Sequence, residues 1–230
     1  MKTRAARLLV AATAGLALAA AGHAALAWHR YGRPRPSDAP PGGLDVCLPS
    51  YEVAERHAGP VAAPADLTFA AALDLRLDRS WLVRAIFGAR ALLLRSGSAP
   101  KERQSPTIAD LETLGWRVVI AEPNRLMVFA AVTRPWEANP RFIGLALDDF
   151  VRFDEPGYVK IAWSIGAEPL GPASSRFVTE TRVSTTDVYA RRRFRLYWVA
   201  FAPGIRVIRR EIVRLVRAEA EARTRAQSLK

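Results

Sequence analysis

The apolar and polar residues of the chain follow two different periods after residue 50. Residues 51–64 read as a first strand. Apolar residues then recur at helical spacing over residues 64–75 and 78–94, and the second of these segments carries Trp81 and Ala89 on one stripe. The start of this region therefore predicts one strand followed by two short helices.

A period of two begins at residue 116 and predicts antiparallel strands. Residues 116–122 and 125–132 flank a Pro-Asn pair and read as a hairpin. Residues 158–165 and 176–184 alternate as well, and we expect these two strands to pair. Their alternation places one set of side chains on a common face, namely Val159, Ile161, Trp163, Ile165, Phe177, Thr179, Thr181 and Val183.

The C-terminal third of the chain returns to the helical period. Ser184, with Asp187 three residues later, resembles a capping box at the start of this helix. Pro203 interrupts or kinks the helix, because proline lacks a backbone N–H and its ring crowds the preceding turn. Arg206 and Arg209 follow, away from a second apolar stripe. Before the proline, one face carries Ala190, Phe194, Tyr197, Trp198 and Phe201.

Four arginines occupy the five positions 191–195, and three interpretations of them are open. They form the solvated face of a helix, which we expect, or they contact nucleic acid, or they face an anionic bilayer. Nucleic-acid binding needs stacking aromatics on the same surface, whereas these aromatics mostly face the other way, so we expect no nucleic-acid partner. Tyr189 and Leu196 lie on the arginine side, which suits a membrane surface. The residues that would meet a membrane are Arg192, Arg193 and Arg195.

The chain of 230 residues has a formal net charge of +12, and this charge belongs to its two ends. Residues 1–35 hold six Lys or Arg and no acid, and residues 187–230 hold twelve against four acids. The remaining sixteen basic and eighteen acidic residues leave the middle at −2. Because 50% of the residues are hydrophobic, we expect a packed core rather than a disordered chain.

Cys47 is the single cysteine, so no disulfide can form within the chain. Together with His23, His29 and His57 it offers no metal-ligand spacing. The sequence also lacks a glycine-rich phosphate loop, a paired-carboxylate motif and a serine-nucleophile elbow. It therefore predicts no metal and no cofactor.

The N-terminal segment is basic and then apolar. Residues 8–28 contain no Asp, Glu, Lys or Arg, and their number is close to that needed to span a bilayer as a helix. We expect a single-pass membrane anchor; the alternative is a signal peptide cleaved near residues 21–24, which would export the protein. A Pro- and Gly-rich stretch follows. The expected organisation is an anchor or signal at 1–31, a linker at 32–50, a folded domain at 51–224 and a tail at 225–230.

Three stretches carry a resemblance to a known superfamily. Residues 61–75 look like the passage from a first strand to a first helix, and residues 115–132 look like an early hairpin. Residues 176–201 look like a last strand that runs into a closing helix. Their order resembles the helix-grip fold of the START and polyketide-cyclase-like (SRPBCC) superfamily, over roughly residues 51–222.

The resemblance implies an α+β fold, in which a curved antiparallel sheet wraps around a long C-terminal helix kinked near Pro203. Two short helices follow the first strand, and the N-terminal membrane or signal helix precedes the domain. The sequence shows five clear strands where the superfamily usually has six or seven, so residues 141–148 or their neighbours must supply the rest. Members bind lipids, sterols, polyketides or other hydrophobic molecules in an apolar cavity between sheet and helix, and some are enzymes.

The alternation and the resemblance together suggest which side chains would line such a cavity. Threonine and tyrosine hydroxyls would orient a ligand among aromatic and aliphatic groups. The alternative is that the same residues pack on one another as ordinary core. The candidate ligand-binding residues are Phe129, Ile161, Trp163, Thr179, Thr181, Phe194, Tyr197 and Trp198.

Candidates for catalysis are few. Glu55 and His57 are two residues apart on the first strand, so both project from one face, where a carboxylate beside an imidazole can perform acid–base chemistry. The alternative is a surface pair on a solvated edge strand. Lys160, Glu180 and Arg182 are expected to form a cross-strand charge ladder on the outer face of the sheet.

Three functions are therefore open. We expect a membrane-attached or exported binding protein for a hydrophobic small molecule or lipid, without catalysis. The second is a cyclase-like or hydrolase-like enzyme that uses His57 and Glu55 in the same cavity. The third is a structural or interaction protein that docks on anionic lipid by its basic helices.

Overall fold

The computed structural model of the protein describes residues 43–76, 80–95 and 107–228, together with residues 35–36, Gly15, Gly22, Ala25 and Tyr31. The apolar segment at 8–28 lies almost wholly outside these residues, so the choice between an anchor and a cleaved signal stays a prediction. Among the helices that the structure describes, none is both long enough and apolar enough to cross a membrane.

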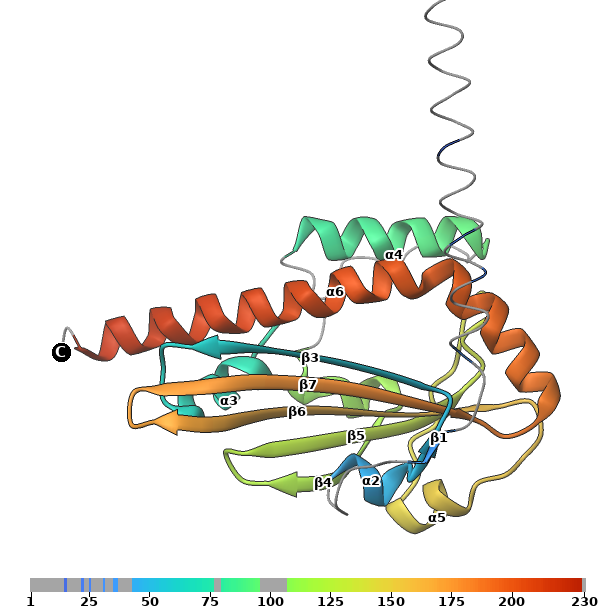
Figure 1. Ribbon diagram of the computed structural model, residues 1–230, viewed down its shortest axis with the longest axis horizontal. Helices are drawn as coiled ribbons and strands as arrows, with labels where there is room; N and C mark the ends of the chain where they lie inside the picture. The colour runs from blue at the N-terminus through green and yellow to red at the C-terminus, as the bar shows by residue number, and fades with distance from the viewer. Residues whose placement is uncertain are drawn as a thin grey trace, which may run out of the picture.

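An antiparallel sheet forms the body of the domain (Figure 1). Its strands are β3 (Val53–Val61), β4 (Arg117–Glu122), β5 (Leu126–Thr133), β6 (Val159–Gly171) and β7 (Ser174–Thr185). The order in space is β3-β7-β6-β5-β4, and the hairpins β4–β5 and β6–β7 pair as the period of two predicts. A separate short pair is formed by β1 (Arg35–Pro36) and β2 (Ser50–Tyr51).

The expectation that residues 141–148 add a further strand to the sheet is wrong. Ile143 forms only an isolated bridge with Val132 of β5, and the main sheet has five strands within the described residues. The β6–β7 hairpin is longer than the alternation alone indicated. Both strands continue through the Gly- and Pro-containing segment, with a register irregularity between Pro169 and Gly171. Extra sheet area thus comes from longer strands and not from an additional one.

Helices cover both faces of the sheet (Figure 1). The longest, α6 (Val188–Ser228), lies along one face, which we call the inner face, and α4 (Trp81–Leu93) packs on the side of α6 away from the sheet. On the outer face lie α2 (Leu44–Cys47) and α5 (Leu147–Arg152). The remaining helices are α3 (Ala65–Leu73), which packs against α6 and the sheet, and the 3-10 helix η2 (Ala109–Leu114). A sheet that grips one long C-terminal helix is the α+β helix-grip architecture that the sequence predicted.

Two apolar clusters fill the space between α6 and the inner face, and each contacts a different half of the helix. Burial of their side chains is the main favourable contribution to folding. The N-terminal cluster consists of Tyr31, Val53, Val159, Val183, Phe194, Trp198 and Ala202. The C-terminal cluster includes Ala71, Ala72, Ile108, Phe129, Trp163, Ile165, Phe177, Ile212 and Val216.

The long helix α6 runs without interruption through Pro203. Figure 1 shows the helix bending toward its N-terminal end, as expected where a proline removes a helical hydrogen bond. The predicted capping box is wrong in one member, because Ser184 belongs to β7. Asp187 is itself the cap, since its Oδ1 accepts the N–H of Ala190 at 2.5 Å.

The folded region begins before the expected boundary at residue 51. Leu44 and Cys47 of α2 fall in the stretch predicted to be linker, and both are buried with Leu48 against the outer face of the sheet. Burial raises the pKa of the Cys47 thiol to about 11, so this thiol stays protonated at neutral pH. Cys47 is therefore a core residue.

The helix α4 packs on α6 through the side opposite to Trp81 and Ala89, the two residues that helical spacing places on one apolar stripe. Val83 is buried, and Ile86 lies close enough to Gly204 of α6 that a Cβ there would be 3.0 Å from its Cγ2. Trp81 is 71% exposed, and Ala89 is exposed as well. Because α4 is apolar on both sides, its periodicity does not show which side is covered.

Alanine substitutions at two glycines should change the free energy of unfolding in opposite directions. Gly115 ends η2 with a φ of 87°, and a Cβ there would overlap the carbonyl oxygen of Phe142. We expect Gly115→Ala to lower the free energy of unfolding by more than the roughly 1–2 kcal/mol that a left-handed backbone costs a side chain.

The matched control is Gly88→Ala in α4. Nothing lies within 4 Å of a Cβ at this position, so the better helix propensity of alanine should raise the free energy of unfolding by about 0.5–1 kcal/mol. Urea denaturation measures whether each substitution raises or lowers the free energy of unfolding. A Gly115→Ala variant as stable as the wild type would show that the close approach of Phe142 is wrong.

Candidate functional site

A polar cluster separates the two apolar clusters beneath the middle of α6. Glu55 and His57 reach it from the same side of β3, as their spacing predicts, and Arg206 and Arg209 reach it from α6. Thr181 of β7 lies opposite Glu55 in the antiparallel register. The two arginines lie on the side of α6 that faces the sheet, which the helical pattern did not indicate.

The carboxylate of Glu55 is held by two donors. Arg206 Nε donates to Glu55 Oε1 at 2.9 Å, and the hydroxyl of Tyr31 donates to the same oxygen at 3.0 Å. The Arg206 guanidinium also contacts the Tyr31 hydroxyl. The side chains of Glu55 and Arg206 are only 13% and 29% exposed, so the ion pair is largely shielded from water. This pair connects the edge strand to the long helix.

His57 lies beside the ion pair with its Nε2 atom buried and without a hydrogen-bond partner among the described residues. This atom is 3.9 Å from Glu55 Oε2, which is beyond hydrogen-bond distance. Burial lowers the pKa of His57; the Glu55 carboxylate raises it, and the guanidinium groups of Arg209, Arg210 and Arg206 lower it. His57 is therefore mainly a neutral imidazole at neutral pH, and the nitrogen without a proton can act as a base.

Arg209 lies against Trp163 on the inner face of the sheet. Its Cζ is 4.4 Å from the centroid of the indole ring, which makes a cation–π contact. Burial lowers the pKa of Arg209 to about 10, and the Glu55 carboxylate opposes this shift. The indole Nε1 of Trp163 donates to Thr179 Oγ1 at 2.7 Å, so its polar group is already satisfied by the sheet.

The predicted ligand-binding residues pack on one another under α6. The ring centroids of Phe194 and Trp198 are 5.6 Å apart, and those of Phe129 and Trp163 are 5.9 Å apart. Thr181 is 9% exposed, and its Oγ1 has no hydrogen-bond partner within the described residues. The role of the predicted ligand-binding residues as ligand contacts stays a prediction. Phe129, Trp163 and Thr179 lie toward the C-terminal cluster, and Ile161, Phe194, Tyr197 and Trp198 lie in or against the N-terminal cluster.

An open pocket of about 500 Å³ lies at the N-terminal end of α6. It forms where this end meets the segment after β5 and the turn before β6. Trp136, which forms part of its wall, also packs against the N-terminal cluster, so the pocket adjoins the core beneath the helix. The lining residues are Arg134, Trp136, Glu137, Pro156, Gly157, Asp187, Tyr189 and Arg193.

The two carboxylates of this pocket already have partners. Asp187 Oδ2 accepts the N–H of Gly157 at 3.1 Å, and its Oδ1 accepts that of Ala190. Glu137 Oε1 lies 3.7 Å from Arg134 Nη1. Both carboxylates of the pocket are therefore bound to other groups of the protein near its walls.

The two arginines of the pocket stand against aromatic rings. Arg134 lies over Tyr158 at 4.2 Å from the ring centroid, and its Nε is buried without a hydrogen-bond partner among the described residues. Arg193 lies over Tyr189 at 5.2 Å, and within the described part of the chain no carboxylate pairs with it. Arg193 is therefore the cation most available to a ligand.

Sequence reasoning singled out Arg193, as a membrane contact, and missed most of the other pocket residues. They come from residues 134–157, where neither the helical nor the strand period holds for long. Gly157, with a φ of 85°, marks the turn that brings this segment to the helix start. The other sequence feature that could have indicated a pocket here is the tryptophan and proline content of the same segment.

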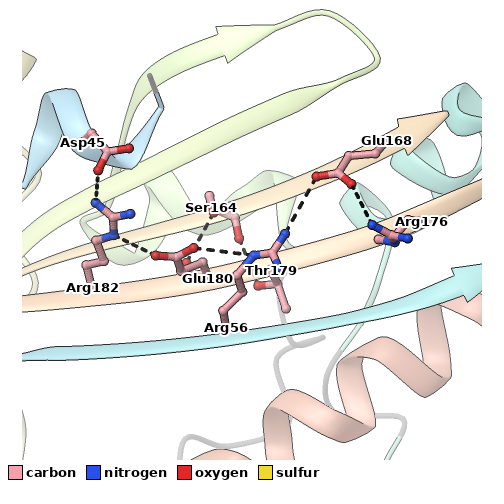
Figure 2. A network of polar contacts seen from close by, with 8 residues as sticks. All are labelled: Asp45, Arg56, Ser164, Glu168, Arg176, Thr179, Glu180 and Arg182. Carbon is pink, nitrogen blue, oxygen red and sulfur yellow. Dashed lines mark hydrogen bonds and ion pairs between the residues drawn. The ribbon is translucent and has the colours of Figure 1, made fainter. Parts of the chain in front are cut away.

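Charged side chains on the outer face pair in a continuous network (Figure 2). Arg182 contacts Asp45 at 2.6 Å and Glu180 at 2.7 Å. Glu180 and Arg182 lie on the outer face as predicted, but their contact runs along β7, and the cross-strand partner of Glu180 is Arg56 of β3. Lys160 is not part of the predicted ladder, since its Nζ donates to the carbonyl of Val151 at 2.7 Å beneath α5. The network runs in the order Asp45, Arg182, Glu180, Arg56, Glu168 and Arg176.

The arginines at 191–195 have different environments. Arg191 pairs with buried Glu52 at 3.0 Å, Arg192 is exposed, Arg193 lines the pocket and Arg195 is half-buried. Arg192 and Arg193 fit the helix exterior predicted for this segment, whereas Arg191 and Arg195 are only partly exposed.

Within the described residues, no group of three or more His, Cys, Asp or Glu side chains is placed to hold a metal ion. No protein-family profile matches the sequence, and comparison with curated proteins gives no match.

Several solved structures are similar to this one. The di-domain aromatase/cyclase BexL from the BE-7585A biosynthetic pathway matches with a TM-score of 0.36 and 12% identity over 74% of this chain, which spans 46% of the length of BexL. A hypothetical protein from Helicobacter pylori matches with a TM-score of 0.37 and 8% identity, over 81% of this chain and 98% of that one. Norcoclaurine synthase from Thalictrum flavum matches with a TM-score of 0.31 and 13% identity, over 79% and 95%. The helix-grip fold of this chain is established by its strand order and by the position of α6.

The lowered pKa of His57 makes stability depend on pH in a defined direction. The unfolded chain takes up a proton near the ordinary pKa of 6.5, whereas the folded chain does so only at lower pH. Between these two values the unfolded state binds more protons, so the free energy of unfolding should fall as the pH drops below about 6.5.

Urea denaturation of the wild type and of His57→Gln at about pH 7 and pH 5 tests this. The His57→Gln variant should lose less stability between these conditions than the wild type. His23→Gln is the matched control, because His23 belongs to the segment predicted to be an anchor or a signal, and it should behave as the wild type does. An identical pH dependence in all three proteins would show that His57 is not buried as described.

Proposed function

We propose that this protein binds a small amphiphilic molecule, with an apolar body and a negatively charged end, in the pocket at the N-terminal end of α6, without catalysing a reaction. The observation that carries the proposal is that one pocket combines two arginines with the rings of Trp136 and Tyr189. Its volume of about 500 Å³ lies within the range of ordinary small-molecule sites.

The charges in the pocket favour a negatively charged end on the ligand. Asp187 is engaged by backbone N–H groups, and Glu137 pairs with Arg134, which leaves Arg193 without a carboxylate partner in the described residues. A guanidinium offers several N–H donors in a plane, which suits the oxygens of a carboxylate or phosphate. We expect Arg193 to hold the anionic end.

The apolar body of the ligand would follow the wall formed by Trp136. This side chain packs against the N-terminal cluster, which contains Phe194 and Trp198 and contacts Ile161 and Tyr197. An apolar chain that enters along Trp136 would therefore approach these candidate ligand-binding residues from one end of the helix. The superfamily that the sequence resembles, whose members bind hydrophobic molecules between sheet and helix, supports this direction of entry.

We also propose that the N-terminal segment holds this domain at a membrane. Support comes from residues 8–28, which lack charged side chains, and from the basic residues on either side of them. Export after cleavage of the same segment is the alternative.

Binding of dodecanoate and of dodecanol to neighbouring arginine variants tests the ligand proposal. Arg193→Ala should weaken binding of dodecanoate about tenfold, because a hydrogen bond to a charged group contributes about 1.5 kcal/mol. It should leave dodecanol unaffected. Arg192→Ala, at an exposed position outside the pocket, is the matched control and should change neither affinity. Native mass spectrometry of the full chain reports the bound fractions, and equal losses in both variants would contradict the proposed site.

One observation favours an enzymatic alternative. His57 is held as a neutral imidazole with a buried, unpartnered Nε2 only 3.9 Å from a carboxylate oxygen of Glu55. Such a pair can accept and return a proton if a substrate reaches it. The Glu55 oxygen nearer to Arg206 is already occupied, so His57 would be the base and Glu55 its electrostatic partner.

Under this alternative His57→Ala should abolish turnover of any substrate found by extraction of the purified protein, while dodecanoate binding in the pocket stays within about twofold of the wild type. His23→Ala serves as the control. Turnover that survives His57→Ala would exclude the enzymatic role of this pair.

A further inference from the structure

The outer side of α4 is apolar along its whole length. Trp81, Leu92 and Leu93 are 71%, 80% and 70% exposed. Helical spacing places the residues between them on the same side, while Val83 and Ile86 face α6. The exposed small residues that complete this face are Ala85, Gly88 and Ala89.

The first turns of α6 carry a second group of exposed apolar residues. Arg90 of α4 lies 6.0 Å from the Tyr197 ring, so the second half of α4 runs beside the first turns of α6. Clusters of large exposed side chains mark surfaces that contact a partner. Six of the eleven large apolar residues exposed in the described part of the chain belong to these two segments, namely Trp81, Leu92, Leu93, Val188, Tyr189 and Leu196.

The charged residues within these two segments are all positive. Residues 80–95 contain three arginines and no acid, and residues 188–200 contain four arginines and no acid. Arg84, Arg95 and Arg192 are exposed at the borders of the apolar residues. An apolar centre with a basic border is complementary to an anionic lipid surface, whereas a second copy of the same surface would bring like charges together.

We propose that α4 and the first turns of α6 dock on the surface of an anionic lipid bilayer. The 13 residues of α4 form a helix about 20 Å long, which would lie in the interface with its outer side among the acyl chains. Trp81 at one end has the side chain that is enriched at such interfaces. This docking surface shares Tyr189 with the ligand pocket, but the proposal does not require that the pocket binds anything.

Fluorescent labels on single introduced cysteines test the proposal in the full chain. Leu92→Cys places a label on the outer side of α4, and Val151→Cys places the matched control on α5, which Figure 1 shows on the other side of the sheet. The native Cys47 is 1% exposed and its thiol stays protonated, so the unmodified protein should take up almost no label.

The labelled proteins are incorporated in vesicles of phosphatidylcholine alone, or of phosphatidylcholine with phosphatidylglycerol, each containing brominated acyl chains that quench on contact. With the anionic lipid, quenching at position 92 should exceed that at position 151 by roughly twofold or more, and high salt should reduce the difference. Measuring at both positions removes the contribution of the N-terminal segment, which attaches both proteins equally.

Three results would overturn the proposal. Equal quenching at both positions would show that α4 does not meet the bilayer, and equal quenching with and without phosphatidylglycerol would remove the role of the arginines. A label at position 92 that is already shielded without lipid would show another occupant. Shielding that rises with protein concentration would then indicate a second copy, and shielding that does not would indicate a segment of the same chain.

Discussion

The grip of the sheet on α6 depends on the ion pair between Glu55 and Arg206, which is shielded between two apolar clusters. Each of two charges removed from water is stabilised by the other. Loss of either one leaves the other without compensation in a poorly hydrated place. Apolar contacts alone tolerate small shifts of a helix along a sheet, whereas the hydrogen bonds among Arg206, Glu55 and Tyr31 are satisfied in one position. The apolar clusters supply most of the stability, and the ion pair favours the register of α6 on β3 in which both charges are compensated.

The Glu55–Arg206 pair divides the interior of the fold into two regions that differ in how close they lie to solvent. The C-terminal cluster is closed by α3 and the second half of α6, and its largest side chains are fully buried. The N-terminal cluster adjoins the pocket through Trp136, so it is the part of the core that lies next to this open pocket. His57 lies between the two, which explains why its imidazole is shielded and surrounded by guanidinium groups at the same time.

The sequence predicted the features that repeat and missed those that depend on contacts distant in the chain. Alternation placed Trp163 and Thr179 correctly on the inner face, because only one register buries the apolar set. It did not place Arg209 there, because an arginine in an amphipathic helix ordinarily faces water, and here the Trp163 ring and the Glu55 charge favour the buried position. The pocket was missed because its walls come from an aperiodic segment, and the covered side of α4 was missed because both of its sides are apolar.

The pocket and the proposed bilayer surface meet at the start of α6. Tyr189 is 56% exposed on this surface and also lines the pocket, and Arg193 is exposed beside it. A molecule that left an anionic bilayer at this point would meet a guanidinium first and the Trp136 wall next, without crossing a wide layer of water. Both surfaces combine arginines with aromatic or aliphatic side chains, so each would favour a molecule with an apolar body and an anionic end. An amphiphile with an anionic head is therefore the class of molecule that would connect the two.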